Sequence, residues 1–266
     1  MNAIRAEGAS KIRGAIVFAI FLFITTCFFG RESRSDQRGV RTVNFSGAEW
    51  MVKSGYGGPG PNVWSDSEES VWVDDEGRLH MKIRKIGGQW HCAEVLTKNF
   101  ARYGVYRFYL IGRIDQLDKN VVFAPFLYAK DHQEVDIEFA KWGQTDLLDG
   151  QGQYVVQPAP YKMNHNIVRF PIKLNGTHST HTIDWWREGV AFTSIHGHFR
   201  TLPDANALIR GWNYRGGKHP RQEDNLRVHI NLWLFNSDSE GRGDPPSDGK
   251  PVEVVIRSVE LPHLTQ

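Results

Sequence analysis

Three acidic residues alternate with apolar residues in the stretch "QEVDIEFAKWG", which runs from Gln133 to Gly143. The acids are Glu134, Asp136 and Glu138. Alternation with a period of two is typical of a β-strand, because successive side chains of a strand point to opposite faces. The pattern therefore predicts three carboxyl groups on one face of a strand, spaced about 6.6 Å apart. Carboxyl groups placed in this way are suited to general acid, general base or nucleophilic catalysis.

Two interpretations of the triplet compete. An exposed strand with an acidic solvent face would explain the acids alone, but it would not explain the aromatic residues around them. Apolar faces of sugar rings stack on aromatic rings while their hydroxyl groups bind polar groups, so the combination favours a carbohydrate-binding surface. Trp142 follows the acidic strand directly, and we expect it to be an exposed platform. The aromatic residues of this region are Phe123, Phe126, Tyr128, Trp142 and Tyr154.

Hydrolysis of a glycosidic bond is the reaction that fits such a surface. Retaining hydrolysis needs two carboxyl groups about 5 to 5.5 Å apart. In an ideal strand the Cα atoms of Glu134 and Glu138 are about 13 Å apart, so their long side chains must lean inward over a curved strand. We expect Asp136 to hold a shared proton between them, and repulsion among the three acids to keep one of them protonated near neutral pH.

Short strands with turn residues between them make up most of the remaining chain. They are rich in β-branched and aromatic residues, and Gly, Asp, Asn or Pro separates them. No amphipathic helix and no internal repeat is evident. Many short strands with regular turns predict an all-β sandwich or jelly roll. The expected strands lie within residues 70–75, 78–86, 104–114, 123–129, 134–140, 152–158, 181–186, 189–197, 227–235 and 252–261.

Composition limits the class of protein. The chain has 266 residues, of which 40% are hydrophobic, and this is enough for one large core. The formal net charge is +2 and no long basic run occurs, so nucleic acid is not an expected partner. Only Cys27 and Cys92 are present, and Cys27 lies in an N-terminal apolar run. A disulfide framework is therefore excluded, and we expect Cys92 to be a small buried residue.

The N-terminal segment, residues 1–30, has the layout of a signal peptide or an N-terminal membrane anchor. Arg5, Lys11 and Arg13 precede an apolar run of about 16 or 17 residues, the lower limit for crossing a bilayer. No clean cleavage site follows, so cleavage, anchoring and lipidation at Cys27 all stay open. Residues 31–42 are expected to be a polar linker and residues 43–266 a single domain. We expect export, with the protein secreted, periplasmic or anchored at the outer face of a membrane.

The stretch "EVDIEF" resembles the E-[ILV]-D-[IV]-E signature of glycoside hydrolase family 16, in the lichenase-like form without a bulge residue. Further segments resemble strands of that family in the same order: "HCAEV", "RYGVYRF", "GQYVVQ", "HSTHTIDW" and "INLWLF". The resemblance runs along most of residues 43–262. It implies a jelly-roll sandwich of two antiparallel sheets, similar to concanavalin A.

The resemblance also implies roles for individual residues. Glu134 is the expected nucleophile, Glu138 the acid/base, and Asp136 the assisting acid. From the repulsion among the three acids, and not from the resemblance, we expect the acid/base to titrate late. Some positions depart from the lichenase pattern: His132 and Leu96 stand where a Trp and an Arg are expected, Gly241 replaces a second Trp, and Asp66 replaces a disulfide partner. Substrate contacts are expected at Glu94, Phe126, Tyr128, Gln153, Asn231 and Trp233, in addition to Trp142.

The sequence therefore predicts a retaining, endo-acting glycosidase that acts on a β-linked polysaccharide. Transglycosylation by the same residues stays open, because water or a sugar hydroxyl can take the covalent intermediate. The alternative is a non-catalytic, lectin-like β-sandwich that binds carbohydrate. We expect a monomer with no cofactor and no catalytic metal. Some relatives hold a structural calcium ion, but no loop in this sequence demands one.

Overall fold

A computed structural model describes residues 39–130, 133–145, 150–157, 166–236 and 242–262 of the chain. The expected signal or anchor segment and residues 31–38 of the expected linker lie outside these ranges. The first strand begins at Thr42, one residue before the expected domain boundary. All of the described residues belong to one compact unit. Within the described ranges, no helix is both long and apolar enough to cross a membrane.

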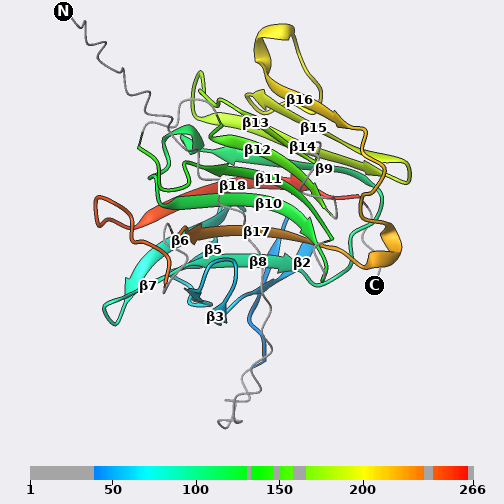
Figure 1. Cartoon of the computed structure of the whole chain (residues 1–266). Coiled ribbons are helices and arrows are strands. Elements are labelled where there is room, and N and C mark those ends of the chain that lie inside the picture. The colour runs from blue at the N-terminus through cyan, green and yellow to red at the C-terminus, as the bar shows by residue number, and fades with distance from the viewer. Residues whose placement is uncertain (1–38, 131–132, 146–149, 158–165, 237–241, 263–266) are drawn as a thin grey trace, which may run out of the picture. The chain divides into compact units, whose positions relative to one another are not determined.

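The chain folds into two antiparallel sheets of eight strands each (Figure 1). The first sheet has the order β1-β2-β8-β17-β10-β11-β12-β13. The second has the order β16-β15-β14-β9-β18-β6-β5, and β7 pairs with β6. Neighbours in each sheet come from distant parts of the sequence, as in a jelly roll. The expected all-β sandwich of two antiparallel sheets is confirmed.

Each of the ten expected ranges overlaps a strand, and β11 agrees with its expected range at both ends, but eight further strands of the described chain were not among those ranges. The first sheet contains β1 (Thr42–Phe45), β2 (Ala48–Val52), β8 (Ala93–Thr97), β10 (Val121–Tyr128), β11 (Glu134–Ala140), β12 (Gly152–Gln157), β13 (Ile167–Phe170) and β17 (Arg227–Leu234). The second contains β5 (Val71–Val73), β6 (Leu79–Ile86), β7 (Gln89–His91), β9 (Gly104–Ile111), β14 (His178–Trp186), β15 (Gly189–His196), β16 (Leu208–Tyr214) and β18 (Val252–Glu260). Three short 3-10 turns occur in the described chain, η1 (Ile114–Gln116), η3 (Ala205–Ala207) and η4 (Gln222–Asp224).

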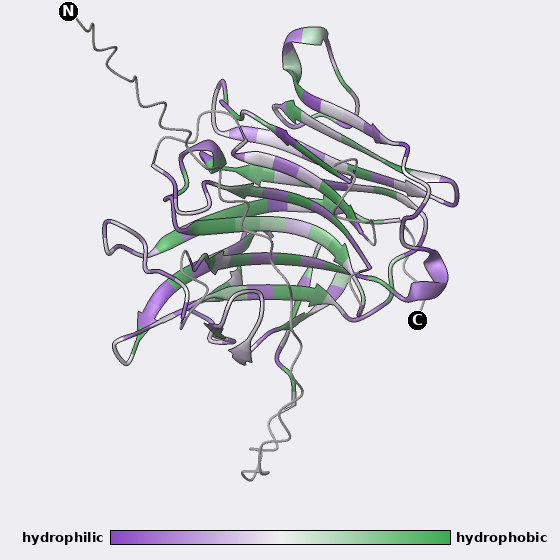
Figure 2. Ribbon diagram, viewed as in Figure 1, coloured by the Kyte–Doolittle hydropathy of each residue, from purple (hydrophilic) through white to green (hydrophobic). Residues whose placement is uncertain are grey.

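Apolar side chains from the two sheets meet between them, and Figure 2 shows how apolar residues concentrate in the strands. The ring of Phe139 in β11 lies 4.7 Å from that of His181 in β14. Tyr154 in β12 stacks on Phe192 in β15 with 4.7 Å between ring centroids, and its hydroxyl donates to Ser194 Oγ at 2.7 Å. These contacts place one face of β11 and β12 against the second sheet, so the alternate residues of both strands face outward.

A small hairpin, β3 (Gly55–Gly57) and β4 (Asn62–Trp64), lies outside both sheets. Asn62 Nδ2 donates to Leu234 O at 2.9 Å and ties the hairpin to the end of β17. Gly60 has a positive φ of 70°, and a Cβ there would lie 2.8 Å from Nδ2 of Asn62. Glycine therefore lets the chain pass close to the end of β17.

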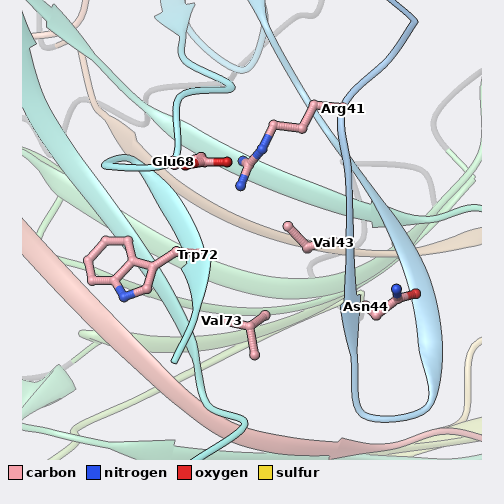
Figure 3. A pocket seen from close by; sticks show the side chains of 6 residues that line it. All are labelled: Arg41, Val43, Asn44, Glu68, Trp72 and Val73. Carbon is pink, nitrogen blue, oxygen red and sulfur yellow. The ribbon is translucent and has the colours of Figure 1, made fainter. Parts of the chain in front are cut away.

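A hollow of about 340 Å³ is lined by residues of β1 and β5 and of the segments that precede each of them (Figure 3). None of the expected site residues lines this hollow. The lining residues are Arg41, Val43, Asn44, Glu68, Trp72 and Val73.

Candidate functional site

The three acids lie on β11, in the interior of the first sheet. Strand β11 pairs with β10 from Tyr128↔Glu134 to Val122↔Ala140 and with β12 from Glu134↔Gln157 to Phe139↔Gly152. Neither pairing shows a register shift, so the strand carries no bulge. The apolar residues of β11 are buried toward the second sheet, and the three carboxyl groups stand together on the outer face. Asp136 is 5% exposed, whereas Glu134 and Glu138 are half-buried.

Cross-strand pairing brings most of the expected contact residues to this outer face, because paired residues of an antiparallel sheet share a face. Tyr128 is opposite Glu134, Phe126 is opposite Asp136, and Gln153 is opposite Glu138. Asn231 of β17 is opposite Glu94 of β8. Strand β17 lies between β8 and β10, so polar and aromatic side chains from five strands form one surface around the acids.

Burial governs the protonation of Glu134 and Asp136. Burial raises the pKa of Glu134 to about 8, the charge of Glu138 adds to the effect, and a hydrogen bond with Asp136 opposes it. Burial also raises the pKa of Asp136 well above its usual value, and the charges of Glu134 and Glu138 add to it. Both shifts disfavour ionisation, and the shift is larger at the deeply buried Asp136, so Asp136 is the last of the pair to lose its proton. The sequence pointed to repulsion as the main cause, but burial comes first.

Glu138 has different partners. Gln153 Nε2 donates a short hydrogen bond to Glu138 Oε2, and Arg169 Nε in β13 donates to Gln153 Oε1 at 3.1 Å. Burial raises the pKa of Glu138, while the amide of Gln153 and the charge of Arg169 lower it. We expected Glu138 to titrate late among the three acids. The structure gives the most strongly raised pKa to Asp136 instead, because Glu138 receives an amide N–H and faces a guanidinium.

Glu94 is held by two basic groups. His229 Nδ1 lies 2.9 Å from Glu94 Oε1, and Lys53 Nζ lies 2.7 Å from Oε2. Burial would raise the pKa of Glu94, but His229 and Lys53 outweigh it and hold the pKa below its usual value. Sequence reasoning missed both basic residues. His229 had a usable signal, because it alternates with Asn231 in "HINLW" and so must share its face.

The aromatic residues of the site differ in exposure. Phe126 is 7% exposed and Tyr128 is 37% exposed, and their rings lie 4.9 and 5.7 Å from that of His229. Trp233 is buried at 5% exposure. Trp142 is half-buried, and its ring packs edge-on against Phe235 at 5.6 Å. The expectation of Trp142 as an exposed platform is therefore wrong, because its ring packs against the residue that follows β17.

The positions that depart from the lichenase pattern differ in their burial and surroundings. Leu96 pairs with His229 across β8 and β17, and it is half-buried. Asp66 is exposed, and the free Cys92 is fully buried as expected. His132 and Gly241 lie outside the described residues. In the part of the chain that the structure describes, no three His, Cys, Asp or Glu residues are grouped as metal ligands.

The chain was compared with known proteins. No protein-family model matches the sequence, and no curated protein matches it. Solved structures do match, with TM-scores just above one half. The β-glucanase of Bacillus licheniformis has a TM-score of 0.53 at 18% identity, covering 84% of this chain and 98% of that chain. A glycosyl hydrolase family 16 protein of Mycobacterium smegmatis has a TM-score of 0.57 at 16% identity, covering 80% and 92%.

A third match has a description of a different kind. It is an immunostimulatory antigen and pseudo β-1,3-glucanase of Mycobacterium tuberculosis, with a TM-score of 0.51 at 20% identity, covering 80% of this chain and 91% of that chain. At such identities a structural match establishes the architecture and leaves the chemistry to the site. The protein therefore has the jelly-roll β-sandwich fold that is found in glycosyl hydrolase family 16 structures.

Proposed function

We propose that this protein is a retaining glycosidase that cleaves O-glycosidic bonds within a β-linked polysaccharide. One observation carries the proposal: three carboxyl groups share the outer face of β11, and burial with mutual repulsion raises the pKa values of Glu134 and Asp136 by different amounts. Pairs of carboxyl groups in different protonation states are what acid/base and nucleophilic steps require. The resemblance of "EVDIEF" to the family signature gives each acid its role.

The reaction proceeds in two displacements. Glu134, as the carboxylate, attacks the anomeric carbon and forms a glycosyl ester, while Glu138 gives its proton to the leaving glycosidic oxygen. Glu138 then removes a proton from water, the water oxygen attacks the anomeric carbon, and Glu134 leaves as the carboxylate. Asp136 keeps its proton throughout and hydrogen-bonds to Glu134, so the nucleophile is ionised beside a neutral neighbour. A sugar hydroxyl that replaced water would give transglycosylation.

The surface around the acids is suited to a sugar chain. Tyr128 offers an exposed aromatic ring next to Glu134. Asn231 Oδ1 and Asp136 Oδ1 are buried oxygen atoms with no hydrogen-bond partner among the described residues. Buried polar atoms cost free energy unless they are paired, and hydroxyl groups of a bound sugar supply donors. Several of the matching solved structures are described as β-glucanases, so β-glucans are the first substrates to test. Export would bring such an enzyme to an extracellular polymer.

A lectin-like protein is the second candidate. One matching solved structure is described as a pseudo β-1,3-glucanase, so the fold also occurs without the expected activity. In this chain both oxygen atoms of Glu94 already have partners, which is a further departure from the contact set that the resemblance implies. The same surface would then bind a polysaccharide and release it unchanged.

Incubation of the full chain with soluble β-glucans, xyloglucan, agar and carrageenan separates the two candidates. Shortened chains are detected by mass spectrometry, and ¹H NMR gives the anomeric configuration of the first product. We expect internal cleavage with retained configuration. Inverted product would contradict the double displacement. Binding in affinity electrophoresis without any cleavage would favour the lectin.

A further inference from the structure

A line of three side chains crosses three neighbouring strands and ends at Glu138. Glu138 of β11 pairs with Gln153 of β12, and Gln153 pairs with Arg169 of β13. The three side chains are joined in the same order, because Arg169 Nε donates to Gln153 Oε1 and Gln153 Nε2 donates to Glu138 Oε2. Gln153 is 6% exposed and Arg169 is exposed. Neither Arg169 nor this line was expected from the sequence.

The donor and acceptor chemistry of Arg169 fixes the orientation of the amide. A guanidinium only donates, so the atom of Gln153 that faces it must be the oxygen. The NH₂ group then necessarily faces Glu138. An ionised carboxylate only accepts, so this orientation suits the ionised form of Glu138. The opposite amide orientation would present an oxygen to Glu138, and only the protonated acid could hydrogen-bond to it.

The fold holds Arg169 in this register. Gly152 is opposite Phe170, and a Cβ at position 152 would lie 2.4 Å from the Phe170 ring. The absence of a side chain at Gly152 lets this ring lie against β12. The ring also packs against Tyr154 with 4.6 Å between centroids. Packing around Phe170 thus sets the pairing of β12 with β13 and places Arg169 beside Gln153.

We propose that Arg169 is a positioning residue for Glu138, acting through Gln153: it orients the amide so that an N–H group is always directed at the acid/base carboxyl. The inference rests on the proposed function, in which Glu138 must be protonated in the first displacement and ionised in the second. A fixed N–H donor favours the ionised form that accepts a proton from water. Arg169 stands two strands from Glu138, and its hydrogen bond is to Gln153.

Other charged groups lie on the same face of the sheet as Arg169 and Glu138. Asp136 and Glu134 stand on the same strand as Glu138, and Glu138 contributes to the raised pKa of both. For Glu138, burial raises the pKa, and Gln153 and Arg169 are the two groups that lower it. The remaining titratable or charged groups on the described strands of this face are Tyr128 of β10, Arg227 and His229 of β17, Glu94 of β8 with its partner Lys53, and Glu49 of β2.

The test compares two substitutions of Arg169. Arg169→Met keeps a long side chain but removes the charge and the donor, and Arg169→Lys keeps both. Initial rates measured against pH give kcat/KM profiles, and ¹³C NMR titration of glutamate-labelled protein gives the Glu138 pKa, assigned from Glu138→Gln. We expect Arg169→Met to raise the Glu138 pKa and to move the basic limb of the profile to higher pH. We expect Arg169→Lys to restore the profile of the parent.

Lys173→Met is the matched control, since Lys173 is an exposed cation three residues beyond β13. It should leave the basic limb unchanged. A second comparison introduces Arg169→Met into the Gln153→Met variant. There it should shift the Glu138 pKa less than it does in the parent, because the amide through which Arg169 acts is already absent. An unchanged Glu138 pKa in Arg169→Met would overturn the proposal, and so would an equal shift in Lys173→Met.

The NMR titration needs no substrate. If the parent cleaves no polysaccharide but Arg169→Met still raises the Glu138 pKa, the proposed function fails and the positioning role stands. If the parent is active and the Glu138 pKa does not respond to Arg169→Met, the positioning role fails and the proposed function stands. Arg169→Leu gives a second neutral variant without a donor, with the same expectation as Arg169→Met. Urea unfolding of each variant checks that it is folded.

Discussion

His229 Nδ1 lies 2.9 Å from Glu94 Oε1, although the two residues are 135 positions apart in the sequence. Both side chains are buried, at 9% and 5% exposure, and Lys53 is paired with the other oxygen of the carboxylate. The charge of Glu94 is therefore compensated before any substrate binds. His229 also contacts the rings of Phe126 and Tyr128, so the pair connects the β8 edge of the site to the aromatic residues beside the acids.

The first prediction concerns this pair. Glu94→Gln should destabilise the protein by about 3 kcal/mol, because removing one partner of a buried ion pair leaves the other charge without compensation. This loss of stability lies at the lower end of the usual range because Lys53 is 28% exposed, so water can partly solvate its unpaired charge. Urea unfolding at pH 7 measures the change. Glu49→Gln is the control, since Glu49 forms an exposed ion pair with Lys98. Loss of this pair should change the free energy of unfolding only slightly. Equal effects of the two substitutions would contradict the prediction.

The second prediction concerns the nucleophile. Glu134→Gln should lower turnover by several orders of magnitude, because the amide keeps the size of the side chain but cannot form the glycosyl ester. Binding of an oligosaccharide, measured by calorimetry, should persist. Near-normal turnover in this variant would show that Glu134 does not form the covalent bond.

The third prediction concerns the acid/base. Glu138→Ala should lose hydrolysis of natural substrates, and azide should restore product formation on an aryl glycoside with an activated leaving group. Such a leaving group needs no proton, and azide replaces the water that Glu138 would activate. Product analysis should identify a glycosyl azide with retained configuration. Rescue of Glu134→Ala with that configuration, in place of Glu138→Ala, would exchange the two roles.

The fourth prediction concerns stability and the raised pKa of Asp136. Burial raises this pKa in the folded state, so the unfolded chain releases the proton more readily. The stability that the neutral group contributes is complete below the unfolded pKa near 4, and it is lost as pH rises toward the folded pKa. Asp136→Asn removes this loss because the amide never ionises. The variant should gain stability relative to the parent as pH rises above about 4, as measured by urea unfolding at several pH values. A constant difference across this range would mean that Asp136 is not held protonated.

Local sequence patterns were enough to predict the strand that carries the acids. Glu134, Asp136 and Glu138 alternate with apolar residues, and a period of two assigns faces without any knowledge of the neighbouring strands. The expected strand 134–140 and the face of its acids agree with β11. The small number of cysteines also predicted a buried Cys92, because an isolated free cysteine is usually a small core residue, and Cys92 is fully buried. It failed for Trp142, because the exposure of a residue beyond the strand end depends on a distant ring, that of Phe235.

Tertiary structure decided which side chains meet across the strands. The line from Arg169 through Gln153 to Glu138 and the pair of Glu94 with His229 both depend on strand register, and register is set by packing between distant segments. It also decided the order of protonation, because desolvation comes from the whole fold and a sequence shows only neighbouring charges. The sequence by itself determined that three carboxyl groups share a face, and only the folded sheet determined which of them has the most strongly raised pKa.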